Sequence, residues 1–432
     1  MATNAAMIRK NRLAFNVHAG SKESRHIHQL DFHHNAADSY YAQLCASCHL
    51  NMEKDRPGAF RGYDKGGGCL ACHLGNDEPE KHLNIGQLVS DKRCFNCHSR
   101  SGRISLSYRG WAELSDPKDS PATTLADNRT VYQKTADLHY TAGLMCNDCH
   151  VSTELMGDGK SHHTKRDSLQ INCADCHSKP APNGLLAIES NQSAKTTTQR
   201  FLILKRNQKK LAIPPYQNAH AGHNPEHARL TCSACHSTWA PDCFGCHIEY
   251  DQNAFAFNHI TGQKERGQWQ EYHGESRTEL PVLGVDNRGR IDSFIPGMKL
   301  SIDKSGFSRP KEDLIEKNIF VPLSPHTIGK SRSCQSCHLN AHALGYGLAN
   351  LKYQNGTWLV INEYQTELQG KYKGLPQDAW ILPGQTNTES PDGRSLNAQE
   401  QTRMLDIGRC IQAHQDTNAA GQLAACSQRH RN

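Results

Sequence analysis

One short pattern, Cys-x-x-Cys-His, uses most of the cysteine in this 432-residue chain. The pattern accounts for 16 of the 18 cysteines and occurs eight times. With this content of cysteine and histidine, chance would produce roughly 0.05 copies. The spacing of these residues therefore reflects one chemical task that is repeated along the chain. The copies begin at Cys45, Cys69, Cys94, Cys146, Cys173, Cys232, Cys243 and Cys334.

Two cysteines three positions apart, followed at once by a histidine, can attach one haem group. The two sulfur atoms form thioether bonds to the vinyl groups of the porphyrin, and the histidine binds the iron. We therefore expect eight covalently attached haem c groups. The predicted thioether cysteines are Cys45, Cys48, Cys69, Cys72, Cys94, Cys97, Cys146, Cys149, Cys173, Cys176, Cys232, Cys235, Cys243, Cys246, Cys334 and Cys337. The predicted iron-binding histidines are His49, His73, His98, His150, His177, His236, His247 and His338.

Zinc sites and disulfide bridges are the other common uses of paired cysteines. A zinc ribbon combines two such half-sites on one metal and needs no histidine beside every pair. Disulfide bridges do not require the histidine at all. Both alternatives therefore explain the repeated pattern less well than haem attachment does.

Histidine is also the expected second axial ligand of these irons. Eighteen histidines lie outside the motifs, whereas the whole chain has only 7 methionines. A histidine close to a motif usually reaches a neighbouring haem, because the motif histidine already occupies the near side of its own. The surplus means that some are ordinary surface or hydrogen-bonding residues. The candidates are His26, His33, His34, His82, His139, His162, His163, His220, His223, His227, His259, His326 and His342.

A glycine-rich turn after the fourth motif offers three further candidate ligands. Gly157 and Gly159 flank Asp158, and two glycines in this arrangement favour a tight turn. We expect the turn to bring Lys160, His162 or His163 over the second haem, that of His73. Lysine must first lose a proton, with an ordinary pKa of about 10.4, whereas imidazole is mostly neutral above about 6.5. His162 is therefore favoured, ahead of His163 and Lys160.

The two remaining cysteines, Cys410 and Cys426, lie in the C-terminal tail. A disulfide bond between them, joining two helices, is the expected arrangement in an oxidising compartment. The alternative is a ninth haem held by a single thioether, because Cys410 is followed by His414 at the motif spacing.

The composition favours short helices around the haem groups over ordinary protein cores. Only 36% of the residues are hydrophobic, and the mean hydropathy is −0.71. We expect a mainly α fold with much irregular structure, a haem-packed core and few strands. The motifs have no fixed period, which argues against tandem duplication of one unit. Only 11 residues separate Cys232 from Cys243, so haems six and seven are predicted to touch.

The spacing of the motifs suggests four segments. Residues 1–44 form an N-terminal arm that supplies distal ligands, and residues 45–247 carry haems one to seven. Residues 248–333 form an insertion without a haem. Residues 334–432 carry haem eight and a C-terminal helical tail.

Export is expected from the chemistry, because haem attachment to this motif takes place outside the cytoplasm in bacteria. The expected location is periplasmic or extracellular, although the first 20 residues show no signal-peptide pattern. No apolar run approaches the ~18 residues needed to cross a bilayer. A net charge of +6 does not point to nucleic acid.

Eight haem motifs on a chain of this length resemble the octahaem cytochromes c, a superfamily with octahaem tetrathionate reductases and hydroxylamine oxidoreductases. The local resemblance is to Gly157-Asp158-Gly159-Lys160 after the fourth motif. It implies a helical haem-bearing architecture over Cys45–His342. For a catalytic member it implies Lys160 and Asp158 near the haem of His73. The segment Phe60–Gly68 lacks the cysteine that this group has before its second motif.

Two functions fit these observations, so whether the protein is an enzyme stays open. The favoured one is an electron carrier with mostly bis-histidine haems, in extracellular electron transfer or in a cytochrome filament formed by self-association. Its partners would be redox proteins or terminal electron acceptors. The alternative is an octahaem reductase of a small sulfur or nitrogen oxyanion, of the tetrathionate, nitrite or hydroxylamine type. Such an enzyme would work at one open or lysine-bound haem.

Overall fold

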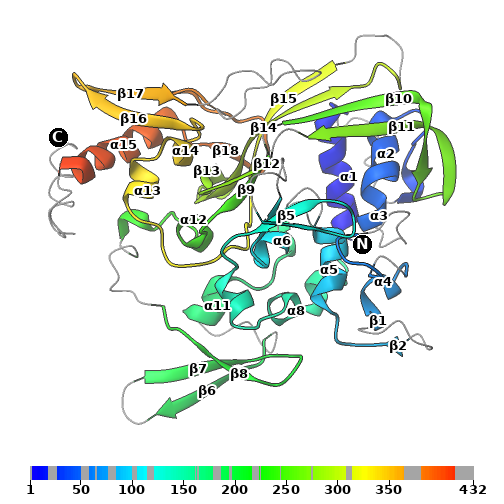
Figure 1. Ribbon diagram of the computed structural model, residues 1–432, viewed down its shortest axis with the longest axis horizontal. Helices are drawn as coiled ribbons and strands as arrows, with labels where there is room; N and C mark the ends of the chain where they lie inside the picture. Colours follow the sequence, from blue (N-terminus) through cyan, green and yellow to red (C-terminus); the bar gives the residue numbers. More distant parts are fainter. Residues whose placement is uncertain are drawn as a thin grey trace.

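A computed structural model describes most of the chain. The described residues are 2–17, 27–49, 58–63, 66–75, 84–99, 105–113, 121–160, 162, 165–178, 186–193, 197–216, 223, 225–243, 245–273, 276–307, 314–363 and 381–413. Figure 1 shows them as an upper region of long strands and a lower arc of short helices.

Most helices of the described residues are short, and seven of the eight motifs lie on them. Polar side chains start several: Ser90 accepts a hydrogen bond at the start of α5, Asn172 at α11 and Thr231 at α12. The helices are α1 (Ala2–Ala14), η1 (Ile27–Gln29), α2 (Ala36–Tyr40), η2 (Tyr41–Cys45), α3 (Ala46–His49), α4 (Leu70–His73), α5 (Asp91–His98), α6 (Ser105–Tyr108), α7 (Leu138–Thr141), α8 (Cys146–Cys149), α9 (Ser152–Leu155), α10 (Lys165–Ser168), α11 (Cys173–His177), η6 (Pro225–His227), α12 (Cys232–His236), α13 (Gln335–His338), α14 (Ala341–Leu344) and α15 (Ala398–Ala413).

Strands are as frequent as helices and form six sheets among the described residues. The largest has six strands in the order β11-β10-β14-β13-β18, with β15 paired to β14. The strands are β1 (Leu74–Gly75), β2 (Asn84–Ile85), β3 (Trp111–Glu113), β4 (Ala122–Thr124), β5 (Thr130–Gln133), β6 (Ile188–Ser193), β7 (Thr197–Ile203), β8 (Lys210–Ile213), β9 (Ala240–Cys243), β10 (Gly245–Asn258), β11 (Gln263–His273), β12 (Ser276–Glu279), β13 (Val282–Asp286), β14 (Ile291–Asp303), β15 (Leu314–Pro322), β16 (Ala349–Gln354), β17 (Thr357–Asn362) and β18 (Gly393–Ser395).

The largest sheet is mixed. β10 pairs with β11 in an antiparallel hairpin and with β14 in parallel, in the register Gly245↔Lys299 to Glu249↔Asp303. One core of the molecule lies where this sheet meets α1 and α2 (Figure 1), with Phe15, Tyr40 and Trp269 in mutual ring contact. The sheet therefore holds the N-terminal helices in place.

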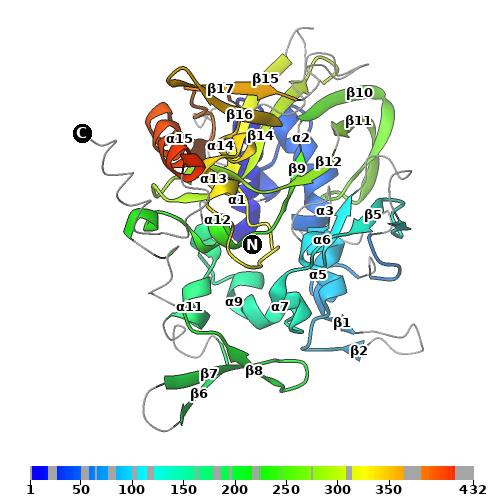
Figure 2. The same ribbon diagram turned by 60° about the vertical axis from the view of Figure 1, so that its left-hand side comes forward.

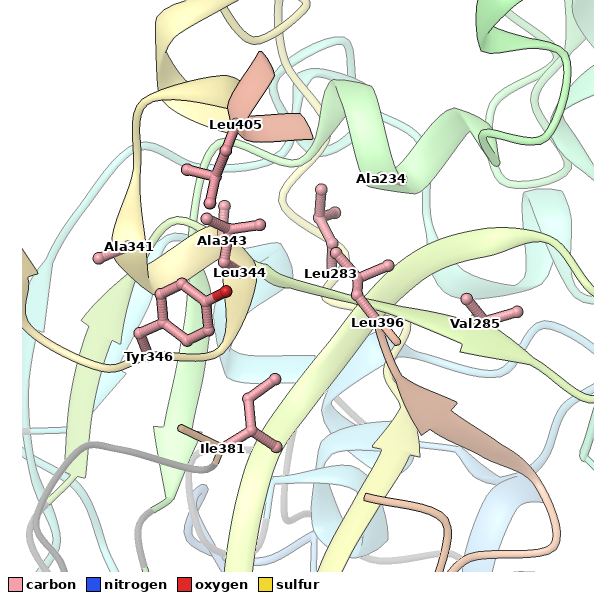
Figure 3. Packing of buried hydrophobic residues seen from close by; sticks show 10 residues of the cluster. All are labelled: Ala234, Leu283, Val285, Ala341, Ala343, Leu344, Tyr346, Ile381, Leu396 and Leu405. Atoms are coloured by element: carbon pink, nitrogen blue, oxygen red, sulfur yellow. The ribbon is translucent and has the colours of Figure 1, made fainter. Parts of the chain in front are cut away.

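A second core joins the largest sheet to the C-terminal helices. Figure 3 shows Ala234 of α12 and Leu283 of β13 close to Leu344 of α14 and Leu405 of α15. Tyr346 also belongs to this cluster, and its hydroxyl donates a 2.6 Å hydrogen bond to Gln401. The cluster fixes two motif helices, α12 and α13, against the sheet.

The small sheets differ in where they pack, and the β16–β17 sheet contacts the second core through Leu351 and Val360. β6, β7 and β8 form an antiparallel sheet that projects below the motif helices in both views (Figures 1 and 2). Arg200 of β7 ties this sheet to α11 by hydrogen bonds to the carbonyl groups of Asp175 and Cys176. The sheet is therefore an appendage of the fifth motif.

The expectation of a mainly α, haem-packed fold with few strands is wrong. The described residues are 30% helical and 32% strand, and they include the mixed sheet. Residues 248–333, expected as an insertion, supply most of that sheet. The cause is visible in β15, where buried Ile315 lies between exposed Leu314 and Glu316, and in the wholly buried β13. Two cores are thus built from side chains.

The structure contains no helix, among the residues it describes, with the length and apolar character needed to cross a membrane. The longest is α15 with 16 residues.

Candidate haem-binding sites

The motif histidines are oriented by hydrogen bonds on the nitrogen that faces away from a haem. In six of the eight motifs, Nδ1 lies 2.9–3.1 Å from an acceptor, and in five of them this leaves Nε2 available for a metal. In the sixth, His247, Nε2 lies 3.4 Å from Glu249 Oε2. Such bonds fix the tautomer and the ring orientation of a ligand histidine. The acceptors are Gly86 O for His73, Glu154 Oε2 for His150, Pro214 O for His177, Gly329 O for His236, Ser301 Oγ for His247 and Met404 O for His338.

Four motif histidines lie opposite a histidine from outside the motifs. In every case one ring belongs to a Cys-x-x-Cys-His motif and the other to a histidine outside the motifs. The pairs, with the distance between ring centroids, are His150 with His326 at 6.2 Å, His177 with His139 at 6.2 Å, His236 with His223 at 6.3 Å, and His338 with His227 at 6.4 Å.

This distance is the one that an iron atom between two imidazoles requires. A metal–nitrogen bond of about 2.0–2.1 Å and a nitrogen-to-centroid distance of about 1.2 Å place the two centroids about 6.4 Å apart. The N–Fe–N axis lies in both ring planes, so the interplanar angle is unrestricted. The residues present therefore fit a bis-histidine haem at the fourth, fifth, sixth and eighth motifs.

The partner histidines come from different parts of the chain. His139 precedes the fourth motif but faces His177 of the fifth. His326 precedes the eighth motif but faces His150 of the fourth. These two arrangements bring together loops and motifs that are far apart in sequence.

The other two partners lie just before the sixth motif. His227, in η6, faces His338 of the eighth motif. His223 faces His236 of the sixth motif, which follows it in the sequence. Burial lowers the pKa of both His227 and His338, which favours the neutral imidazole that a metal needs.

The remaining distal candidates are placed as follows. His33 and His34 are exposed, and His34 bonds to Asp31 at 3.1 Å. His259 and His342 are buried. His162 contacts Asp158 through Nε2 at 3.0 Å, and Lys160 is exposed. The expected ligation of the second haem from this turn therefore stays a prediction. His26, His82, His163 and His220 lie outside the described residues.

Two buried carboxylates contact the histidine pairs, and the sequence analysis missed both. Glu154 accepts from His150, and Asp137 accepts from His139 at 2.9 Å. Burial opposes ionisation of Glu154, but hydrogen bonds from His150 and from two backbone N–H groups lower its pKa. The i, i+4 spacing of His150 and Glu154 was the available clue.

Motif cysteines of different haem sites lie against one another. Side-chain hydrogen bonds join Cys94 to Cys146, and Cys173 to Cys232. The bond from Cys173 outweighs burial and lowers the pKa of the Cys232 thiol to about 6. These contacts link motif three to motif four, and motif five to motif six.

Apolar clusters link further motifs. Cys149 and Cys176 pack in one cluster, which joins motifs four and five. Ala234 and Cys337 share the cluster of Figure 3, which joins motifs six and eight. Motifs four, five, six and eight are therefore consecutive neighbours.

The N-terminal motifs continue the series. Burial raises the pKa of Cys72, and the nearby Cys94 raises it further. This proximity links motifs two and three. Burial lowers the pKa of His49, Cys48 raises it, and the charge of His98 lowers it, which places motif three near motif one. The neighbour series thus runs 8–6–5–4–3–1, with motif two beside motif three. In Figure 1 the helices from α13 through α12, α11 and α8 to α5 follow this order as an arc.

The seventh motif differs from the others because it lies at the junction of β9 and β10, not on a helix. Cys246 is buried in the cluster that also contacts Cys45, which places motif seven beside motif one. The ring of His247 lies 6.3 Å from that of Tyr272, its cross-strand neighbour. The predicted contact between haems six and seven stays a prediction, while the described contact of Cys232 is with Cys173.

Cys410 on α15 is disulfide-bonded. Its predicted partner, Cys426, and His414 of the alternative ninth haem site lie outside the described residues. Helix α15 also supports the eighth motif, because Met404 accepts the His338 bond and Gly408 packs against the backbone of His338.

A protein-only metal site is not formed by the part of the chain that the structure describes. No three His, Cys, Asp or Glu side chains converge there as they would around a zinc ion.

No family model, no curated protein and no solved structure matches this chain. The resemblance to the octahaem cytochromes c is therefore not supported at the level of family. It is also wrong at the level of fold, since that resemblance implies a helical, haem-packed architecture. The described residues instead hold helix and strand in near-equal shares, with a mixed sheet.

Proposed function

We propose that the protein is an electron-transfer protein that carries eight covalently bound haem c groups, mostly with two histidines on each iron. The observation that carries the proposal is the set of four histidine pairs at 6.2–6.4 Å. Each unites one motif histidine with one other histidine. Haem iron held in this way cycles between Fe(III) and Fe(II) by gaining and losing one electron.

The contacts between motifs support a route for electrons. Neighbouring attachment sites touch through Cys94 and Cys146 and through Cys173 and Cys232. The neighbour series 8–6–5–4–3–1–7 extends from the C-terminal helices to the largest sheet. One iron is oxidised as the next is reduced, so the protein needs no further reactant between its ends.

Redox proteins or terminal electron acceptors at the two ends of this series are the expected partners. The location that the attachment chemistry requires is the periplasm or the cell exterior. Both statements rest on the haem proposal.

Mass and spectroscopy test the proposal directly. The intact mass of the purified protein should exceed that of the polypeptide by eight haems, and the absorption spectrum should be that of low-spin, six-coordinate iron. Carbon monoxide should not bind to the reduced native protein. A mass without eight haems contradicts the proposal. Rapid carbon monoxide binding would instead favour a reductase with an open haem.

A further inference from the structure

We propose that Glu154 and Asp137 are positioning residues that lower the reduction potentials of the fourth and fifth haems. Each accepts the Nδ1–H hydrogen bond of one axial histidine, His150 or His139. The inference rests on the proposed haem binding, and it assigns a role to residues that do not touch the haem.

Both carboxylates are buried, and each also accepts a hydrogen bond from a backbone N–H group. The side chain of Glu154 is 4% exposed and that of Asp137 is 2% exposed. The Ile171 N–H group donates to Glu154 Oε1 at 3.0 Å, and the Ile328 N–H group donates to Asp137 Oδ2 at 2.7 Å. The acceptors are therefore fixed in position before any ligand binds.

Several other described histidines have neutral acceptors on Nδ1. Backbone carbonyl groups accept from His73, His177, His236, His338 and the partner His326. His247 contacts the hydroxyl of Ser301. The histidine pairs of the fourth and fifth sites thus each include a carboxylate on Nδ1, an arrangement that also occurs at the exposed His34, which bonds to Asp31.

A negative acceptor on Nδ1–H makes the imidazole a stronger electron donor to the iron. A stronger donor stabilises Fe(III) more than Fe(II), so the one-electron reduction becomes less favourable and the potential falls. His150 and His139 belong to neighbouring sites, since His139 faces His177 of motif five. The low-potential pair therefore lies in the middle of the series 8–6–5–4–3–1–7.

The test compares redox titrations of the full-length, haem-loaded protein and its variants. In Glu154→Gln, and independently in Asp137→Asn, one of the one-electron transitions should move to higher potential. Both variants should keep eight haems by intact mass and a low-spin spectrum. Glu189→Gln is the matched control, because Glu189 is half-exposed and pairs with Lys210 away from any motif histidine, so it should move none.

A variant of opposite sign keeps the test decisive if a buried carboxylate proves necessary for folding. Ser301→Asp places a carboxylate where His247 now contacts a hydroxyl, and one transition should move to lower potential. Unchanged potentials in variants that retain all eight haems would overturn the inference and leave the proposed function intact. Fewer than eight haems on the unmodified protein would overturn the proposed function itself.

Discussion

At the scale of single residues, the proposed haem chemistry depends on pairs of histidines that the chain brings together from separate segments. His227 and His338 illustrate this, because their rings lie 6.4 Å apart although η6 and α13 belong to different parts of the sequence. Each non-motif histidine of a pair can therefore be replaced without changing the cysteines that would attach the haem. Its loss should leave the thioether bonds in place and expose one coordination position on the iron.

Replacing His227 with alanine should therefore convert one haem from low-spin to high-spin and create one carbon monoxide site per molecule. The number of haems by mass should not change, because the cysteines of the eighth motif remain. The measurement is electron paramagnetic resonance together with carbon monoxide titration. Lys209→Ala is the control, since Lys209 is exposed and is not a candidate ligand, so this change should leave the spectrum unaltered. An unaltered spectrum in the His227 variant would contradict the pairing.

The sequence alone was enough to propose the attachment residues, but it could not propose which histidines lie beside each other. Each copy of the motif spans only five residues, so local spacing alone defines it. The partner of His150 is His326, and no local pattern connects two residues so far apart. Acceptors such as Met404 O and Pro214 O are backbone atoms, which leave no trace in the residue type.

At the scale of elements, the helix α15 positions the eighth motif. Asn397 and Glu400 form a reciprocal capping box at its start, with backbone-to-side-chain hydrogen bonds of 2.9 Å in both directions. Glu400 also contacts Arg394 and Arg229. Burial alone would raise the pKa of Glu400, but these hydrogen bonds outweigh it and lower the pKa to about 2, from an ordinary 4.5.

Glu400→Gln should therefore lower the free energy of unfolding by about 1–3 kcal/mol at neutral pH. The folded-state pKa lies below the unfolded one, so the stabilisation is complete above pH 4.5 and is lost as the pH falls toward 2. The difference between wild type and variant, measured by chemical denaturation, should be large at pH 7 and should shrink at pH 3. A difference that is independent of pH would contradict this role. Gln412→Ala, an exposed change on the same helix, is the control.

The elements were harder to predict than the motifs because their stabilising contacts are not local. β10 pairs in parallel with β14, which follows it by more than 30 residues. The low mean hydropathy of the whole chain did not indicate short apolar strands such as β13, which is buried along its whole length. The mixed sheet therefore arises from tertiary pairing that composition does not reveal.

At the scale of the whole molecule, the motif contacts define a path with one side branch. Motifs five and six are joined at Cys173 and Cys232, whereas motif two contacts the series beside motif three. Removing a haem from the path should have a different effect from removing one from the branch. The two cases differ in how quickly electrons equilibrate.

Replacing Cys173 and Cys176 with alanine should remove one haem and divide the path. Rapid reduction, monitored by stopped-flow absorption, should then show two phases. Electrons reach one part of the path only by crossing the gap left by the missing haem. Replacing Cys69 and Cys72 is the matched control, since it also removes one haem but leaves the series 8–6–5–4–3–1–7 continuous. Equal kinetics in both variants would contradict the proposed route.

The long-range histidine pairs also have a consequence for how the chain folds. An iron attached at the fourth motif receives its native ligand only after His326 has been synthesised, so the loop closed by that bond is very long. Until that loop closes, other non-motif histidines can occupy the same coordination position. We expect refolding from denaturant to pass through misligated, kinetically trapped states. Added imidazole, which competes for these positions, should speed the escape from such traps.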